Sequence, residues 1–211
     1  MRGKFITFEG IDGSGKSTQL KILADKLQSD GFDVLATQEP GGTPLGRQLR
    51  KVFLETEEKV APLAELLLFA ADRAQHVNFL IKPSLSAGKI IISDRYADAT
   101  VAYQGAGRGF DTATINQIIQ LATGGLKPDL TLFFDVSVEA AIARTHSRHV
   151  EGEQKNRMDS ETVEFYERVR RSYLQIANEE PARFRVIEAS GAIDEIKEKV
   201  FALVAEFLQN K

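Results

Sequence analysis

The chain has 211 residues, a formal net charge of −3, and a content of 43% hydrophobic and 27% charged residues. These values are typical of one soluble globular domain, which we expect to span residues 1–211, and the acidic balance argues against a nucleic-acid partner, which would need a basic face. No apolar run is long enough to span a membrane, and the lack of cysteine, which excludes thiol catalysis, disulfides and zinc–thiolate sites, fits a cytoplasmic location.

The N-terminal segment combines an apolar strand, expected over residues 5–8, with a glycine-rich loop and a helix expected over residues 17–30. The loop reads Gly-Ile-Asp-Gly-Ser-Gly-Lys-Ser-Thr from residue 10 and fits Gly-x-x-x-x-Gly-Lys-Ser/Thr, the phosphate-binding loop. Glycines allow backbone N–H groups to approach phosphate oxygens, and the N-terminus of the following helix favours an anion. We expect Lys16 to reach the outer phosphates of a nucleoside triphosphate and Ser17 to bind Mg²⁺. The residues expected to contact the triphosphate here are Gly10, Ile11, Asp12, Gly13, Ser14, Gly15, Lys16, Ser17 and Thr18. A plain glycine-rich turn before an ordinary helix is the alternative, but strand, loop and helix occur in the required order.

The rest of the chain alternates strands with helices. A loop over residues 39–44 follows the second strand, and Thr43 can cap the next helix with Pro44 at its first position. The run 61–82 is apolar on most sides, so we expect a buried helix there. Further strands are expected over residues 33–37, 89–94, 130–135 and 184–188, and further helices over residues 111–123 and 194–209. The alternation predicts an α/β fold with a five-stranded parallel sheet and helices on both faces, whose ligands lie beyond the carboxyl ends of the strands.

Two charged residues end the strand at 89–94. Asp94 follows three isoleucines, an arrangement that places a carboxylate near Mg²⁺ and phosphates, although capping of the following helix is an alternative of equal weight. Arg95 directly after it favours the first interpretation, because a guanidinium at this strand end could hold a second phosphate by paired hydrogen bonds.

Phe69 and Arg73 lie one turn apart and share a helix face. An arginine on such an apolar face would be costly to bury unpaired. It could form an interior salt bridge, or it could hydrogen-bond a ligand base that stacks on Phe69, and we favour the second.

The segment around residues 145–157 is polar and rich in arginine. Arg144 and Arg148 repeat at helical spacing, where like charges repel, and residues 148–157 resemble a mobile loop. A solvated charged surface is one interpretation. The other is a lid that closes over the triphosphate, excludes water and brings arginines onto developing negative charge.

Taken together these residues resemble the bacterial thymidylate kinases, a family of P-loop nucleoside monophosphate kinases, over nearly the whole chain. The motifs that carry the resemblance are Phe8-Glu-Gly-Ile-Asp-Gly-Ser-Gly-Lys-Ser-Thr18, Glu39-Pro-Gly-Gly-Thr43, Phe69-Ala-Ala-Asp-Arg73, Asp94-Arg-Tyr96, Ala102-Tyr-Gln-Gly105 and Gly107-Arg-Gly109. The resemblance implies transfer of the ATP γ-phosphate to dTMP, giving dTDP for dTTP biosynthesis, with Mg²⁺, in a cytoplasmic homodimer.

The resemblance also implies a role for individual residues. It puts Phe69 under the thymine ring, with Arg73 and Gln104 at the polar edge of the base. It assigns the remaining dTMP contacts to Asp12, Glu39, Arg50, Arg95, Thr100 and Tyr103. Tyr103 would pack where a ribose 2′-hydroxyl would lie, and Asp12 would approach the 3′-hydroxyl. The catalytic set implied is Lys16, Asp94, Arg95, Arg148 and Arg157, with Ser17 and Asp94 at the metal and Arg144 at ATP.

The sequence departs from the family pattern at four places. Gly13 stands where many relatives have a basic residue, which points to the subgroup whose lid arginines supply the catalytic charge. Gln38 replaces a common Arg, Ala99 replaces a usual Ser, and the lid segment is longer than is typical.

Two other functions remain open at this stage. A sister kinase for another nucleoside monophosphate, or a deoxynucleoside kinase, would share the fold and differ only in the base pocket. A nucleotide-dependent switch is the rival from another class, but the Asn-Lys-x-Asp motif of GTPase switches is absent from the sequence.

Overall fold

The computed structural model describes residues 2–56, 58–150, 158 and 161–209. Five parallel strands form one sheet in the order β2-β3-β1-β4-β5. The strands are β1 (Lys4–Glu9), β2 (Val34–Gln38), β3 (Ile90–Asp94), β4 (Leu130–Asp135) and β5 (Phe184–Glu188). The predicted five-stranded parallel sheet is confirmed, and the bounds of all five strands lie within one residue of those expected.

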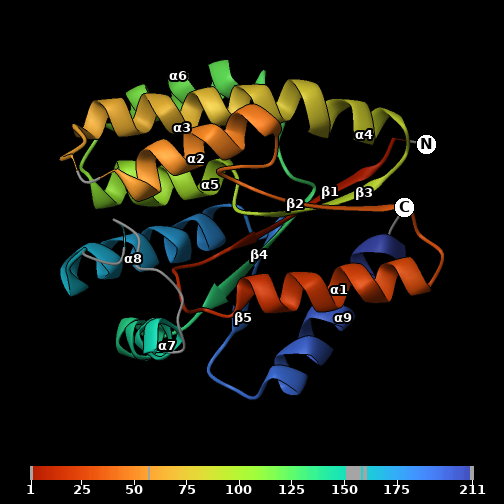
Figure 1. Ribbon diagram of the computed structural model, residues 1–211. Coiled ribbons are helices and arrows are strands. Elements are labelled where there is room, and N and C mark those ends of the chain that lie inside the picture. Colours follow the sequence, from red (N-terminus) through yellow and green to blue (C-terminus); the bar gives the residue numbers. More distant parts are fainter. Residues whose placement is uncertain (1, 57, 151–157, 159–160, 210–211) are drawn as a thin grey trace.

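Helices cover both faces of the sheet (Figure 1), as the alternating sequence predicted. One face carries α2 (Pro44–Glu55), α3 (Pro62–His76) and α4 (Lys82–Ser86), and the other carries α1 (Lys16–Ser29) and α9 (Ile193–Gln209). The remaining helical elements are η1 (Val77–Ile81), α5 (Ala97–Thr100), η2 (Val101–Gly107), α6 (Thr112–Thr123), α7 (Val138–Val150) and α8 (Val163–Glu179). No helix in the described part of the chain is long and apolar enough to cross a bilayer.

The central strand β1 serves two cores because its side chains alternate between the faces. Ile6 and Phe8 belong to the larger core, which includes residues of α1, α8 and α9. Phe5 belongs to the smaller core with residues of η1, α4 and β3. With both faces covered, β1 is buried from Phe5 to Glu9, and apolar side chains therefore point to both faces of the sheet.

Local signals in the sequence explain where several helices begin. The Thr43 hydroxyl accepts from the backbone N–H of Gly46 and Pro44 is the first residue of α2, as expected. The Asp111 carboxylate accepts from the N–H of Thr114 and so caps α6, which ends at Gly124 in the left-handed region. These caps fix the ends of helices whose middles are set by packing.

Two expectations about helices were wrong. The run 61–82 is helical but not buried on most sides, because Leu63 and Leu67 are each 52% exposed on the outer face of α3. The helical run also continues to Ser86 through the π-helical turn η1. Residues 148–150, expected to begin a loop, form the last turn of α7, since no glycine or proline interrupts the sequence from residue 138 to residue 150.

Candidate active site

The phosphate-binding loop joins the end of β1 to the start of α1. Gly15 precedes α1 with φ of +88°, a conformation that favours glycine, and a Cβ built there meets no heavy atom within 4 Å. The neighbouring Ser14 Oγ is buried without a hydrogen-bond partner. Open space, an unpaired buried hydroxyl and a helix N-terminus together fit a bound phosphate.

Gly13 is required by packing as well as by its backbone. Its φ is +83°, and a Cβ there would lie 2.2 Å from the carbonyl oxygen of Ala141 in α7. A basic side chain at this position therefore has no room while α7 lies against the loop.

Lys16 lies between two carboxylates at the strand ends. Its Nζ is 3.5 Å from Asp12 Oδ1 and 3.9 Å from Asp94 Oδ1. The Ser17 hydroxyl donates to Asp94 Oδ2 at 2.5 Å. A hydroxyl and a carboxylate oxygen side by side are the kind of ligands that Mg²⁺ takes when phosphates and water complete its shell, so the residues present fit the metal, although the described residues contain no group of three or more His, Cys, Asp or Glu that would hold a metal alone.

Asp12 also pairs with Arg95. Arg95 Nη2 donates to Asp12 Oδ1 at 3.0 Å, and the guanidinium lies over the Tyr103 ring at 4.8 Å from its centroid. Burial acts to raise the pKa of Asp12, but the charges of Arg95 and Lys16 outweigh it and hold the pKa well below its usual range. Asp12 is therefore an anion that holds two cations in place at the loop.

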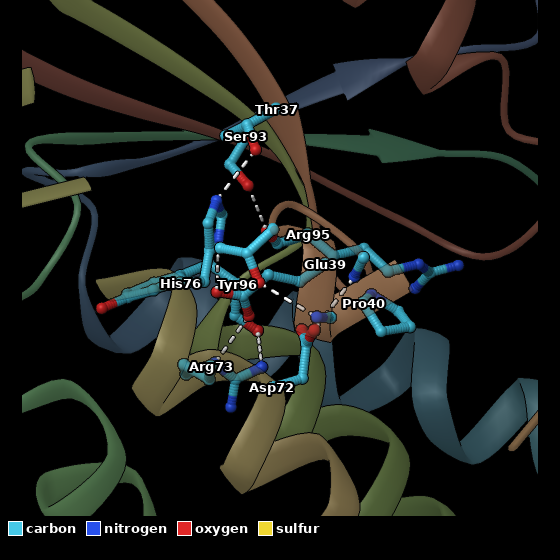
Figure 2. Close-up of polar contacts among 12 residues, drawn as sticks. Thr37, Glu39, Pro40, Asp72, Arg73, His76, Ser93, Arg95 and Tyr96 are labelled. Atoms are coloured by element: carbon cyan, nitrogen blue, oxygen red, sulfur yellow. Dashed lines mark hydrogen bonds and ion pairs between the residues drawn. The ribbon is translucent and has the colours of Figure 1, made fainter. Parts of the chain in front are cut away.

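The backbone of Arg95 adopts a conformation that non-glycine residues avoid. Its φ is +71°, the only positive φ of a non-glycine residue in the described part of the chain. Three hydrogen bonds fix it: Arg95 N–H to the Phe8 carbonyl at 2.9 Å, Ser93 Oγ to the Arg95 carbonyl at 2.8 Å, and Tyr96 N–H to Glu9 Oε1 at 2.8 Å. Figure 2 shows Ser93, Arg95 and Tyr96 in this turn. Strain held in this way at a strand end is typical of functional sites.

A buried ion pair joins α3 to the loop after β2 (Figure 2). Arg73 Nε donates to Glu39 Oε2 at 2.7 Å, and His76 Nδ1 lies 2.9 Å from Glu39 Oε1. Burial acts to raise the pKa of Glu39, but the Arg73 guanidinium and the hydrogen bond from His76 outweigh it and lower the pKa. The interior salt bridge considered for Arg73 is thus present. The ion pair uses Nε, while Nη1 donates to Thr100 Oγ1 and Nη2 donates to the Tyr96 carbonyl at 2.8 Å. Each terminal nitrogen carries a second N–H group, and these are the ones left for a ligand.

Phe69 lies between two polar contacts that connect α3 with the segment formed by α5 and η2. At one end Arg73 Nη1 donates to Thr100 Oγ1 at 2.6 Å, and at the other Gln104 Nε2 donates to Glu65 Oε1 at 3.2 Å. Glu65, Phe69 and Arg73 follow at intervals of four on one face of α3. The Phe69 ring packs on Phe53 of α2 with centroids 4.7 Å apart.

The other predicted acceptor residues lie around the same strand ends. Arg50 Nη1 donates to the Pro40 carbonyl at 2.9 Å, at the loop that contains Glu39. The Tyr103 hydroxyl is buried and forms no hydrogen bond of regular geometry, although the Arg95 guanidinium is close enough to act on its pKa against burial. An unpaired buried hydroxyl beside Arg95 is a polar group that a ligand could satisfy.

The predicted arginines of the lid segment fall partly outside the structure described. Arg144 Nη1 donates to the Ala189 carbonyl at 3.0 Å and lies 3.4 Å from the Gly13 carbonyl, so this side chain is at the phosphate-binding loop. The Arg148 side chain and the whole of Arg157 lie outside the described residues.

Several polar residues of the site were not singled out from the sequence. They are Glu9, Glu65, Asp72, His76 and Arg108, each joined by a hydrogen bond to a predicted site residue, to a residue of the motifs quoted above or to another of the five. Glu9, Asp72 and Arg108 stand within motifs quoted above, so their polar character inside a motif could have identified them. Glu65 could have been identified only by its four-residue spacing from Phe69, which places both residues on one face of the helix.

Comparison with known proteins identifies the family of the chain. Residues 8–200 match the family model described as Thymidylate kinase. The chain is 45% identical over 205 residues to thymidylate kinase of Geotalea uraniireducens, covering 96% of each, and 47% identical over 208 residues to that of Nitratidesulfovibrio vulgaris, covering 97% of each. A crystal structure of thymidylate kinase from Ehrlichia chaffeensis superposes with a TM-score of 0.79 at 36% identity, covering 97% of this chain and 100% of that one. The chain therefore belongs to the thymidylate kinase family, whose members phosphorylate dTMP to dTDP with ATP.

Proposed function

We propose that Lys16, Asp94 and Arg95 form the catalytic centre of this enzyme, which transfers the γ-phosphate of ATP to dTMP. The observation that carries the proposal is the convergence of the three side chains on Asp12 and Ser17 at the carboxyl ends of β1 and β3. Lys16 is assigned to the outer phosphates of ATP, which the loop from Gly10 to Thr18 holds by its backbone. Arg95 is assigned to the phosphate of dTMP.

The acceptor nucleotide is assigned to the space beside Phe69. The thymine stacks on that ring with Arg73 and Gln104 at its polar edge, while Arg50 and Arg95 hold its phosphate. Tyr103 packs against the sugar and Asp12 approaches the 3′-hydroxyl. Glu39 and Thr100 support the base site through their bonds to Arg73.

The reaction requires positioning more than acid–base chemistry. A phosphate oxygen of dTMP is already anionic at neutral pH, so it can attack in line without a strong base, and the protein contributes alignment and neutralisation of charge. Asp94 is therefore assigned, together with Ser17, to hold Mg²⁺ and not to act as a base. Mg²⁺, when bound, neutralises charge on the transferred group.

The lid is assigned to residues 145–157 of a single domain that spans residues 1–211. Support for one domain is the single sheet that the described residues form. Because Gly13 has no room for a cation, charge on the transferred phosphoryl group has to come from elsewhere in the chain. Arg148 and Arg157 are the proposed source, with Arg144 at ATP.

We also propose that the enzyme is a homodimer that associates through α3. Leu63, Leu67 and Ala71 are exposed at intervals of four along the helix face opposite Phe69 and Arg73. A continuous apolar stripe of this kind marks an interface. A Leu67→Glu variant is expected to elute as a monomer in size-exclusion chromatography with light scattering, and a dimer that survives the change would exclude this face. The cytoplasmic location remains a prediction.

The catalytic assignment is tested by ADP release in the presence of ATP and Mg²⁺, with dTMP, dUMP, dCMP, dGMP, AMP, UMP and thymidine offered in parallel. Preference for dTMP is expected, together with near-complete loss of turnover, by about 10³-fold, in Lys16→Ala and Arg95→Ala, since each removes a charge from the transition state. Both variants should unfold as cooperatively as the parent protein. Normal turnover in Lys16→Ala would refute the assignment.

A further inference from the structure

We propose that Glu65 is a specificity-determining residue, which fixes the side-chain amide of Gln104 so that its carbonyl faces the base. The pocket then accepts a pyrimidine that carries a hydrogen on N3 and rejects one that carries a lone pair there. This inference rests on the placement of the thymine between Arg73 and Gln104 proposed above.

Glu65 is a buried carboxylate that accepts hydrogen bonds from Gln104 in η2 and from Arg108, the residue that follows η2. Its Oε1 accepts from Gln104 Nε2 at 3.2 Å and from Arg108 Nε at 3.1 Å, and its Oε2 accepts from Arg108 Nη2 at 3.3 Å. Glu65 is 1% exposed and Gln104 is 3% exposed. Arg108 also donates to Glu161 Oε1 at 2.6 Å and lies over the Phe165 ring.

The chemistry of these groups leaves one orientation for the amide. An ionised carboxylate can only accept hydrogen bonds, and the adjacent Arg108 guanidinium, which can only donate, favours the ionised form of Glu65. The Gln104 amide must therefore turn its NH₂ end toward Glu65, because the reverse orientation would bring two acceptors together in a buried site. Its Oε1 accepts no hydrogen bond from a described residue and is the end left for a ligand.

The fixed carbonyl distinguishes thymine from cytosine. Thymine has a hydrogen on N3 and an oxygen at position 4, which match the Gln104 carbonyl and an Arg73 N–H. Cytosine has a lone pair on N3, which would face the Gln104 carbonyl, and an amino group at position 4. A glutamine that could rotate its amide would match either base at N3, so the discrimination at N3 depends on Glu65.

The test compares kcat/KM for dTMP and for 5-methyl-dCMP, which has the same shape and differs in hydrogen bonding. Glu65→Met removes the acceptor and leaves Arg108 paired with Glu161. The preference for dTMP over 5-methyl-dCMP is expected to fall roughly tenfold or more, the scale of one mismatched buried hydrogen bond. An equal loss on both substrates would show that Glu65 is only structural and would overturn the proposal.

Three further variants separate the role of Glu65 from loss of folding and from a wrong placement of the base. Glu161→Gln is the matched control, because it removes the other carboxylate paired with Arg108 and leaves the Gln104 amide with its partner. The preference for dTMP is expected to stay the same. The double variant Glu65→Met, Arg108→Met is used if the single variant folds poorly, because it removes the acid and the base together. It is expected to lose the preference for dTMP as the single variant does. Gln104→Met tests the placement of the base: if it also leaves the preference unchanged, the thymine does not meet Gln104 and the acceptor assignment fails. If only Gln104→Met changes it, the assignment stands and the role of Glu65 is refuted.

Discussion

Tyr103 and Tyr173 are two buried tyrosines near the phosphate-binding loop, and their hydroxyl groups differ in whether the protein itself supplies a hydrogen-bond partner. Tyr173 Oη donates to Glu9 Oε2 at 2.8 Å, so its hydroxyl is satisfied within the protein. The Tyr103 hydroxyl is buried beside Arg95 and forms no hydrogen bond of regular geometry. An unpaired buried hydroxyl costs free energy in the ligand-free protein. The cost is consistent with a group that is paired only when dTMP is bound.

Phenylalanine at each position separates the two cases. Tyr103→Phe is expected to leave the free energy of unfolding unchanged or to raise it by about 1 kcal/mol, because it removes an unpaired group, while kcat/KM for dTMP falls. Tyr173→Phe is expected to lower the free energy of unfolding by about 1–3 kcal/mol, because Glu9 loses a buried donor. Urea unfolding and steady-state kinetics on both variants supply the measurements. A destabilised Tyr103→Phe protein would mean that the hydroxyl is already paired in the free enzyme.

For single residues, the sequence predicted which side chains gather better than it predicted their conformation. The roles expected of Lys16 and Ser17 rest on a motif whose spacing reflects phosphate geometry, and the structure brings both to the same strand ends. The left-handed backbone of Arg95 could not be predicted, because it is held by hydrogen bonds that involve Phe8, Ser93 and Glu9 on two different strands. Local propensity alone would place an arginine at negative φ.

Among the elements, α3 does two tasks with its two faces. Glu65, Phe69 and Arg73 face the site, and Leu63 and Leu67 face outward. The sequence identified the helix but not its two faces, because apolar residues at helical spacing look alike whether they meet a core or a second subunit. The polar residues on the inner face carried the missing information, since a buried charge requires a partner.

The Glu39–Arg73 pair is the main polar contact between α3 and the loop after β2. Glu39→Gln is expected to lower the free energy of unfolding by about 3–5 kcal/mol, because Arg73 would be left buried with its charge uncompensated. Lys26→Gln is the matched control: its pair with Asp30 is as short, at 2.5 Å, but both side chains are more than 40% exposed. Its expected effect is about 0.5 kcal/mol or less. Equal effects of the two changes in urea unfolding would contradict burial as the deciding factor.

In the whole molecule, the active site is produced by the order of the strands. β1 lies at the centre of the sheet, so its loop meets the ends of β3 on one side and β4 on the other. The alternation of strands and helices was sufficient to predict a parallel sheet covered on both faces. It was not sufficient to predict the strand order, which depends on how each crossover packs and not on the strand sequences.

Glu9, at the end of β1, connects the segment after β3 with α8, because it accepts hydrogen bonds from Tyr96 N–H and from the Tyr173 hydroxyl. Burial and the Asp98 carboxylate raise the pKa of Glu9 to about 8, despite the opposing charge of Arg95. Below the unfolded pKa of 4.5 both states hold the proton, and above about 8 both have released it. Between these values only the folded state keeps the proton, so rising pH favours unfolding.

The wild-type free energy of unfolding should therefore fall with rising pH between pH 5 and pH 8, with Glu9 contributing up to about 1.4 kcal/mol per pH unit. Glu9→Gln should remove that slope, because its amide is neutral throughout, can accept from Tyr96 N–H and can donate to Tyr173 Oη. Asp72, whose pKa burial and the Glu39 charge raise to about 6, titrates in both proteins and cancels in the difference. Urea unfolding of both proteins at each pH supplies the two curves. Parallel curves would mean that Glu9 is already ionised in the folded enzyme at pH 5, and that the Arg95 guanidinium outweighs its burial.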